Sequence, residues 1–313
     1  MSTSDDTERT AAFMTADLAS AMSSRAQPSS ADALLAQPPA KLGLVHLDHV
    51  LDALAELQPL VEARSQDVVA GVPLSAREAL TAVNLELILQ PHGWLARTTG
   101  QAKAGMAEFT RQFRAADEAL QALRTAGRQV VQRQGQQAAV LERLRMRLDV
   151  ESAALKGLVE QGSKGLQAAH AELQKQRAVA GADAALAASL RQQAACYEPF
   201  VARFKLLRAV QSSLTGLLES LGRAQVQWLA LARTLDEAVP SAEQAWLQVF
   251  RPYADAREQP RVNREWVEDL HQKLAEALAH AAKTAPLALS LDAQLQQALP
   301  DLRRMITEGT PPA

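Results

Sequence analysis

Two histidines come closest to a chemical site in this sequence. His46 and His49 lie three positions apart, which places both on one side of a helix, and Asp48 and Asp52 are close by. Imidazole and carboxylate groups bind transition metals, but a stable site needs further ligands and the sequence places no third one. We therefore interpret these residues as a solvated helix surface and predict no metal site.

The arginine-rich motif LERLRMRL, at 141–148, is the strongest candidate for recognition of an anionic partner. On a helix, Arg143, Arg145 and Arg147 spread over a wide arc, and no aromatic residue lies between them to stack on bases. We interpret them as arginines whose aliphatic stems flank a leucine seam. No specific nucleic-acid site is predicted.

Other signals of catalysis are missing. The glycines are scattered apart from Gly162 and Gly165, and no phosphate-binding GKS or GKT motif follows them. His271 and His280 are too far apart on a helix to form one site. The single Cys196 excludes an intramolecular disulfide, and its apolar neighbours predict a small buried side chain. The sequence thus predicts no catalytic residue, no cofactor and no enzyme.

Four tryptophans stand out in a chain with only 4% aromatic residues: Trp94, Trp228, Trp246 and Trp266. Their helical, apolar surroundings favour a role as packing anchors where long helices meet shorter ones. An exposed pair would instead mark a surface for a protein partner.

The elements that position these residues are dominated by one long helical run. Between Pro91 and Pro199 there are 107 residues without proline, built mainly of strong helix formers. Leu144, Leu155 and Leu166 are spaced by eleven, which is typical of an almost straight helix, whereas a strict heptad fails at Gly162. The predicted apolar stripe consists of Leu120, Leu123, Val130, Leu141, Leu144, Leu148, Leu155, Leu158, Leu166 and Leu173.

This run must fold back on itself, and Gly181 followed by Asp183 is the preferred hairpin. The cluster at Gly162 and Gly165 is the alternative. A returning arm is predicted over 183–238, bent near Pro199 and ended by Pro240. Its apolar positions are Leu186, Leu190, Phe200, Phe204, Leu207, Val210, Leu214, Leu217, Leu218, Leu221, Trp228 and Leu235.

Shorter helices are predicted before the run. Residues 1–40 have little to bury and are expected to be disordered, with a transient helix over 11–22. A helix begins at Leu44, and Pro59 interrupts or kinks it. A second begins at Ser75, with Glu78 completing a capping box, and ends near Gln90.

Three further helices are predicted after the run. Ser241 is the predicted N-cap of the first helix, with Gln244 completing a capping box. Asn263 is the predicted N-cap of the second helix, which runs to about Lys283. Ser290 opens the last. No alternating strand pattern occurs.

Charge is unevenly distributed, although the net charge is only −2. Residues 1–96 hold 5 basic and 12 acidic side chains, and residues 97–147 hold 10 and 4. The acidic front segment and the basic arm could attract each other, or the arm could bind an acidic partner. With no secretory signal and no long apolar run, we expect a soluble cytoplasmic protein without a transmembrane segment.

Two segments resemble a known family. Residues 109–173 read FTRQFRAADEALQALRTAGRQVVQRQGQQAAVLERLRMRLDVESAALKGLVEQGSKGLQAAHAEL, and residues 198–235 read EPFVARFKLLRAVQSSLTGLLESLGRAQVQWLALARTL. A helical arm followed by Arg, Leu-Leu-Arg, Gln and a downstream Trp is similar to the toxic anion resistance family associated with tellurite tolerance. The resemblance implies a cytoplasmic helical protein of stress resistance and carries over no functional residue.

The sequence predicts an all-α, elongated antiparallel coiled coil or helical bundle with shorter helices packed at one end. Its segments are 1–40, disordered; 41–96, short helices; 97–239, the coiled coil with its turn near 181; and 240–313, C-terminal helices. The expected function is that of a non-enzymatic interaction or scaffold protein, whose partner is another protein or a second copy. A secreted or injected helical protein, such as a toxin component or export-machine accessory, is the alternative.

Overall fold

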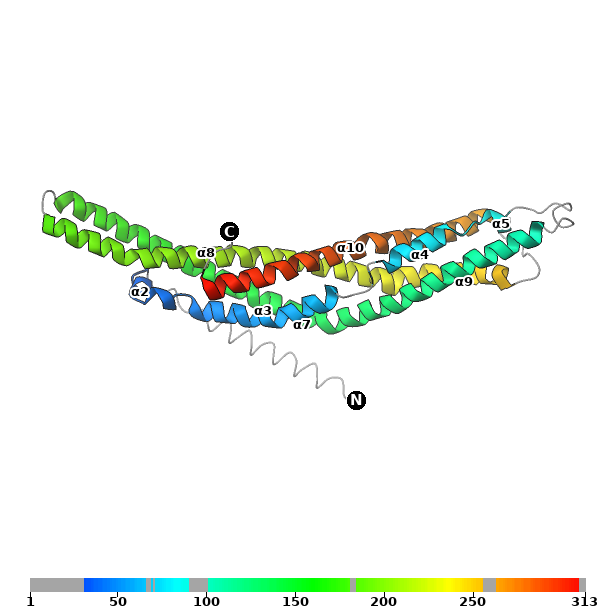
Figure 1. Cartoon of the computed structure of the whole chain (residues 1–313), viewed down its shortest axis with the longest axis horizontal. Helices are drawn as coiled ribbons and strands as arrows, with labels where there is room; N and C mark the ends of the chain where they lie inside the picture. Colours follow the sequence, from blue (N-terminus) through cyan, green and yellow to red (C-terminus); the bar gives the residue numbers. More distant parts are fainter. Residues whose placement is uncertain are drawn as a thin grey trace, which may run out of the picture. The chain divides into compact units, whose positions relative to one another are not determined.

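The computed structural model describes residues 31–65, 69, 71–89, 101–180, 184–255 and 263–309. Every regular element in these ranges is helical, so the predicted all-α class is confirmed. In chain order (Figure 1) the elements are α2 (Ala31–Leu35), η1 (Pro39–Lys41), α3 (Leu44–Ser65), α4 (Val72–Thr81), α5 (Glu86–Leu89), α7 (Gln101–Ala180), α8 (Ala184–Arg233), the π-helical turn η3 (Thr234–Ala238), α9 (Val239–Asp255) and α10 (Arg264–Glu308).

Two helices carry the proline-free run: α7 has 80 residues and α8 has 50. All predicted apolar positions of α7 are buried except Leu158, which is half-buried. Of the apolar positions predicted for the returning arm, Leu186 is exposed, Leu218 is half-buried and the others are buried. The helices break between Ala180 and Ala184, next to the predicted hairpin. Gly181 and Asp183 themselves lie outside the described residues.

The alternative hairpin at Gly162 and Gly165 is wrong, because both residues lie inside α7. Their role is to let other side chains approach the helix. A Cβ atom at Gly162 would lie 2.0 Å from Cζ of Phe204, and one at Gly165 would lie 2.9 Å from Cβ of Ala31. Glycine is therefore required at these positions for packing and not for a turn.

Replacing Gly162 with Ala should destabilise the protein by about 1–3 kcal/mol, because Phe204 must move out of a packed site. Gly157 is a matched control in the same helix, since a Cβ there meets nothing within 4 Å. Gly157→Ala should stabilise the protein by about 0.5–1 kcal/mol through helix propensity. Urea unfolding measures both, and equal effects of the two substitutions would contradict this packing.

The chain divides into two compact units, each built from separate stretches. The first comprises Met1–Pro59, Glu142–Glu219 and Gln296–Ala313. Gly43 precedes α3 with φ +70°, and a Cβ there would lie 3.1 Å from Leu207. Nε of Arg203 donates to the carbonyl oxygen of Leu42 at 2.8 Å, so the start of α3 is fixed against α8. Buried apolar side chains of this unit include Leu47, Val50, Leu54, Leu144, Leu148, Leu155, Val210, Leu214, Leu299 and Leu302.

The acidic front segment meets the basic arm inside this first unit. Glu56 of α3 pairs with Arg147 at 2.9 Å and with Arg143 at 3.9 Å, and Asp52 lies 3.8 Å from Arg147. These pairs are exposed, so they orient α3 on α7 and contribute little to stability.

The second unit comprises Leu60–Leu141 and Ser220–Leu295. At its centre the carboxylate of Asp292 is completely buried. Nη2 of Arg64 donates to Oδ1 of Asp292 at 2.7 Å, and Nε1 of Trp228 donates to Oδ2 at 2.7 Å. One carboxylate thus joins the end of α3, α8 and α10. The guanidinium carbon of Arg64 also lies 6.0 Å from the centre of the Trp228 ring.

Asp292→Ala should lower the free energy of unfolding by about 3–5 kcal/mol, because it leaves the Arg64 charge buried without its partner. The double variant Arg64→Met with Asp292→Ala should be less destabilised than Asp292→Ala alone, since both buried charges are then gone. Thermal unfolding followed by circular dichroism compares the two. A double variant as unstable as the sum of both single variants would contradict this account.

The helix starts predicted at Ser75 and Ser290 are wrong. α4 begins at Val72 with Gly71 as its N-cap and Pro73 in its first turn, so Ser75 lies inside the helix. Ser290 lies inside α10, which continues past Lys283 because Ala281, Ala285, Ala288 and Leu295 extend its buried stripe. The predicted cap at Asn263 is confirmed, since its Oδ1 accepts from the backbone N–H of Glu265 at 2.9 Å.

Prolines interrupt fewer helices than predicted. Pro59 lies within α3, where Leu57 and Val61 are both buried. Pro240 does not end the returning arm but stands in the first turn of α9, so Ser241 is not a cap. The π-helical turn before it, in which the N–H of Val239 donates to the carbonyl of Thr234, widens the backbone where a proline ring would clash. The predicted stop near Pro91 lies outside the described residues.

Candidate functional site

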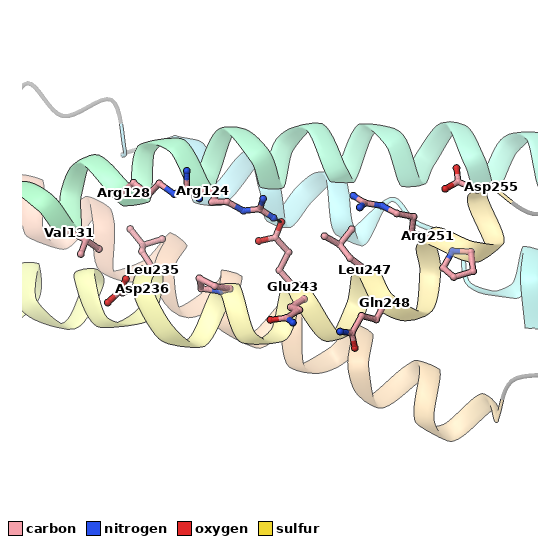
Figure 2. Close-up of a pocket in the computed structure, with 13 residues that line it drawn as sticks. Arg124, Arg128, Val131, Leu235, Asp236, Glu243, Leu247, Gln248, Arg251 and Asp255 are labelled. Atoms are coloured by element: carbon pink, nitrogen blue, oxygen red, sulfur yellow. Dashed lines mark hydrogen bonds and ion pairs between the residues drawn. The ribbon is translucent and has the colours of Figure 1, made fainter.

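A cleft of about 690 Å³ lies in the second unit, between α7 and α9 (Figure 2). α7 supplies Arg124, Arg128 and Val131, and η3 supplies Leu235 and Asp236. The remaining lining residues belong to α9: Pro240, Glu243, Gln244, Leu247, Gln248, Arg251, Pro252 and Asp255. The α9 side of the cleft is mixed, because α9 contributes three apolar residues and five charged or amide residues to the lining.

Two ion pairs set the register of α9 on α7. Nη2 of Arg124 lies 2.5 Å from Oε1 of Glu243, and Nη2 of Arg251 lies 3.5 Å from Oδ2 of Asp117. Asp117 precedes Arg124 in α7, whereas its partner Arg251 follows Glu243 in α9. The two helices are therefore antiparallel. Figure 2 shows Arg124 and Glu243 reaching toward each other across the cleft.

An aromatic cluster lies beside this cleft and fixes the same pair of helices. The rings of Phe113 and Trp246 stack with centres 5.1 Å apart, and Trp246 lies 5.0 Å from Phe250. Phe109 completes the cluster, 6.3 Å from Phe250. Aromatic rings bury far more apolar surface than alanine does, so these four residues anchor α9 in an alanine-rich protein.

Glu243 is almost fully buried at the floor of the cleft. Burial raises the pKa of its carboxyl above the ordinary value, although the hydrogen bond and the charge of Arg124 oppose the shift. Folding therefore favours the protonated carboxyl. This contribution to stability is present below the ordinary pKa of glutamate and is lost as pH rises through the folded-state pKa.

Glu243→Gln should thus gain stability relative to the unmodified protein as pH rises from about 4 to about 7. Glu108 is a control of opposite sign, because hydrogen bonds from Arg111 and Gln112 lower its pKa to about 2. Glu108→Gln should lose relative stability as pH rises from about 2 to about 4.5, the interval between the folded-state pKa and the ordinary pKa of glutamate. Melting temperatures measured across the pH series report the stability of both variants relative to the unmodified protein. If the relative stability of the two variants changed with pH in the same direction, the opposite pKa shifts of Glu243 and Glu108 would be contradicted.

The charged groups of the cleft come from arginine and carboxylate side chains. The residues that line it include three carboxylates, Asp236, Glu243 and Asp255, and no serine, cysteine, histidine or lysine. Within the described residues, Arg128, Asp236 and Asp255 form no ion pair. These side chains can pair with charged groups of another molecule.

A second, more apolar hollow of about 500 Å³ lies on the other side of α9, against α10. It is lined by Ala245, Gln248, Val249, Pro252, Tyr253, Trp266 and Leu270, so it shares Gln248 and Pro252 with the cleft. Trp266 is 49% exposed. It faces away from the core because its neighbour Val267 is completely buried, and successive helix residues point in directions about 100° apart.

The tryptophans therefore differ in role. Trp228 and Trp246 are buried packing anchors, as expected from their surroundings. Trp266 is exposed, and Trp94 lies outside the described residues. The sequence does contain a signal that Trp266 is exposed. Val267, Leu274 and Leu278 are spaced so that they share one buried face of α10, and Trp266 lies off that face.

The structure brings His46 and His49 together on Glu151 of α7, a residue that the sequence did not single out. Nδ1 of His46 lies 2.7 Å from Oε2 of Glu151, and Nδ1 of His49 lies 2.9 Å from Oε1. Burial would raise the pKa of Glu151, but the hydrogen bonds and charges of both histidines hold it below the ordinary value. Asp48 and Asp52 do not join this cluster. The described residues contain no group of three His, Cys, Asp or Glu side chains arranged to enclose a metal ion.

The remaining candidates are separate from one another. Arg145 pairs with Glu142 of its own helix at 2.7 Å, and its neighbours Arg143 and Arg147 pair with α3 beside the buried Leu144 and Leu148. His280 lies 3.1 Å from Oγ1 of Thr234. Burial lowers the pKa of His271, whose Nδ1 has no partner.

The prediction of a buried Cys196 is wrong, because the thiol is exposed on α8. Between Ala184 and Phe200 only Leu190 and Phe200 are buried, so the apolar seam is narrow in this part of the helix. Cys196 falls outside that seam.

A scan against protein-family models, a search of the curated proteins and a search of the solved structures each found no match. Among the described helices, none combines the length and apolar character that crossing a membrane requires.

Proposed function

We propose that this protein is a non-enzymatic interaction protein that binds a protein partner through α9 and the start of α10. The observation that carries the proposal is the exposed Trp266 at the edge of the apolar hollow. A large aromatic side chain left half in water beside a concave apolar surface is typical of a partner-binding site.

The composition of this surface supports a protein partner. Val249, Tyr253 and Leu270 give the hollow an apolar floor, and Trp266 stands at its edge with about half of its surface accessible. Interfaces are enriched in aromatic residues at their centre and polar at their rim. The lining of the hollow also includes the polar Gln248.

The cleft on the other side of α9 extends the same surface. Because Gln248 and Pro252 line both concavities, a partner segment that crosses α9 can contact both. An apolar side chain of the partner would enter the hollow, and charged groups would pair with Arg128, Asp236 or Asp255. The hollow would supply most of the affinity and the cleft most of the specificity.

Trp266→Ala should remove partner binding while leaving helicity and melting temperature unchanged, since the side chain is half exposed. Leu287 is a matched control on the same helix with 47% exposure, and Leu287→Ala should bind as the unmodified protein does. Affinity capture after chemical cross-linking identifies a partner protein, and sedimentation velocity detects a second copy. Equal capture and equal self-association by both variants would contradict the proposal.

We propose resistance to toxic anions as the cellular setting, supported by the resemblance of residues 109–173 and 198–235 to that family. The same two variants test it in a deletion strain. Leu287→Ala should restore growth on tellurite and Trp266→Ala should not. Unchanged tellurite tolerance after deletion would refute the setting and leave the binding surface to be judged by the capture experiment.

A further inference from the structure

The unpaired charges of the cleft between α7 and α9 lie at its two ends. Arg128 and Asp236 belong to one end, where a Cβ atom at Gly127 would lie 3.3 Å from Cβ of Leu235. Asp255, the last residue of α9, belongs to the opposite end (Figure 2). Asp236 and Asp255 are separated by roughly 28 Å of helix. All three charged side chains are exposed, and none of them has an ion pair within the described residues.

Four of the residues that α9 contributes to the cleft form a polar ridge. They are Gln244, Gln248, Arg251 and Asp255, which are all exposed and follow one another at intervals of four, three and four residues. This spacing places the four side chains on one face of the helix. Side-chain ridges of one helix pack into the grooves between others. The same surface thus holds a groove and a ridge of the kind that fills one, which is the self-complementarity that two identical chains need to bind each other.

The charges of the cleft are self-complementary as well. A twofold axis across the middle of the cleft places each end of it opposite the other end of the same cleft in the second copy. Arg128 then meets Asp255 of the second copy, and the reciprocal contact forms at the opposite end. Asp236 meets Arg251 of the second copy, whose exposed guanidinium has further N–H donors besides the nitrogen that lies 3.5 Å from Asp117. Every unpaired charge of the cleft gains an opposite charge in this arrangement.

The direction of α9 favours the same arrangement. α9 ends at Asp255, so the partial negative charge of the helix C-terminus adds to the charge of this carboxylate. A cation beside a helix C-terminus is stabilising. Arg128 of the second copy supplies that cation.

We propose that the partner bound at the α9 surface is a second copy of this chain, related by a twofold axis so that the α9 ridge of each copy enters the cleft of the other. This inference rests on the proposed function, because it names the partner of the same surface. Trp266 borders the contact, since Gln248 and Pro252 line both the cleft and the apolar hollow. The two α9 helices run antiparallel at the centre of a four-helix bundle, with α7 of each copy outside them. Because the contact is polar and charged, salt weakens it.

Sedimentation velocity of the full-length protein tests the dimer. We expect a monomer–dimer equilibrium that weakens as salt is added and forms no larger species, because a twofold contact uses each surface once. Arg128→Glu and Asp255→Lys should each weaken dimerisation about 10-fold or more, since each brings like charges together at both ends of the cleft. Circular dichroism checks the fold of each variant.

Lys156 provides the matched control, because it is an exposed cation of α7 in the first unit. Lys156→Glu makes the same change of charge as Arg128→Glu and should dimerise as the unmodified protein does. A protein that stays monomeric, assembly into larger species, or equal effects of Lys156→Glu and Arg128→Glu would overturn the proposal.

Mixing the two charge variants tests the twofold geometry. An equimolar mixture of Arg128→Glu and Asp255→Lys chains should recover the dimer, because the two substituted positions attract each other at one end and the native Arg128 and Asp255 pair at the other. Unfolded chains cannot produce this recovery. Failure of the mixture to dimerise would overturn the proposed axis.

Trp266→Ala separates this inference from the proposed function. Loss of the dimer in this variant and in both charge variants would support the two together. A monomeric protein from which Trp266→Ala removes capture of a different protein would overturn the second copy as partner and leave the proposed function standing. A charge-dependent dimer that Trp266→Ala leaves unchanged would support the second copy and contradict the role of Trp266 in the proposed function.

Discussion

The buried carboxylate of Asp292 is the interaction on which the second unit depends. It accepts hydrogen bonds from Arg64 at the end of α3 and from Trp228 of α8, while its own backbone belongs to α10. A buried charge is tolerated only when it is paired and hydrogen-bonded, so these three helices can meet here in one register only. The position of α10 then fixes where Trp266, 26 residues earlier in the same helix, emerges from the core.

The same unit explains how α9 becomes a surface with two faces. Phe109 and Phe113 hold α9 on α7 through Trp246 and Phe250, and the π-helical turn η3 allows α8 to pass into α9 despite Pro240. One side of α9 thus lines a charged cleft and the other an apolar hollow. In a protein built mainly of alanine and leucine, aromatic side chains are concentrated at the place that we propose for partner binding.

Sequence periodicity predicted much of the fold and little of the site. The buried stripes of α7 and α8 follow from the spacing of their leucines, because a helix has only one way to bury such a stripe. Local capping signals were less reliable: Ser75 and Ser290 resemble N-caps, yet tertiary burial of Leu80 in α4 and of Ala285 and Ala288 in α10 decides where the helices run. The Glu151 and Asp292 clusters could not be predicted, since each joins residues more than 60 positions apart in the chain and depends on helix register.

The central claim is that the surface around Trp266 is covered by a partner protein in the cell. Photo-cross-linking from an unnatural amino acid placed at position 266 tests it most directly, with the same group at position 287 of α10 as the reference. The account predicts a discrete cross-linked species from position 266, either with another protein or with a second copy, and none from position 287. Cross-links of equal yield from both positions, or none from position 266, would contradict it.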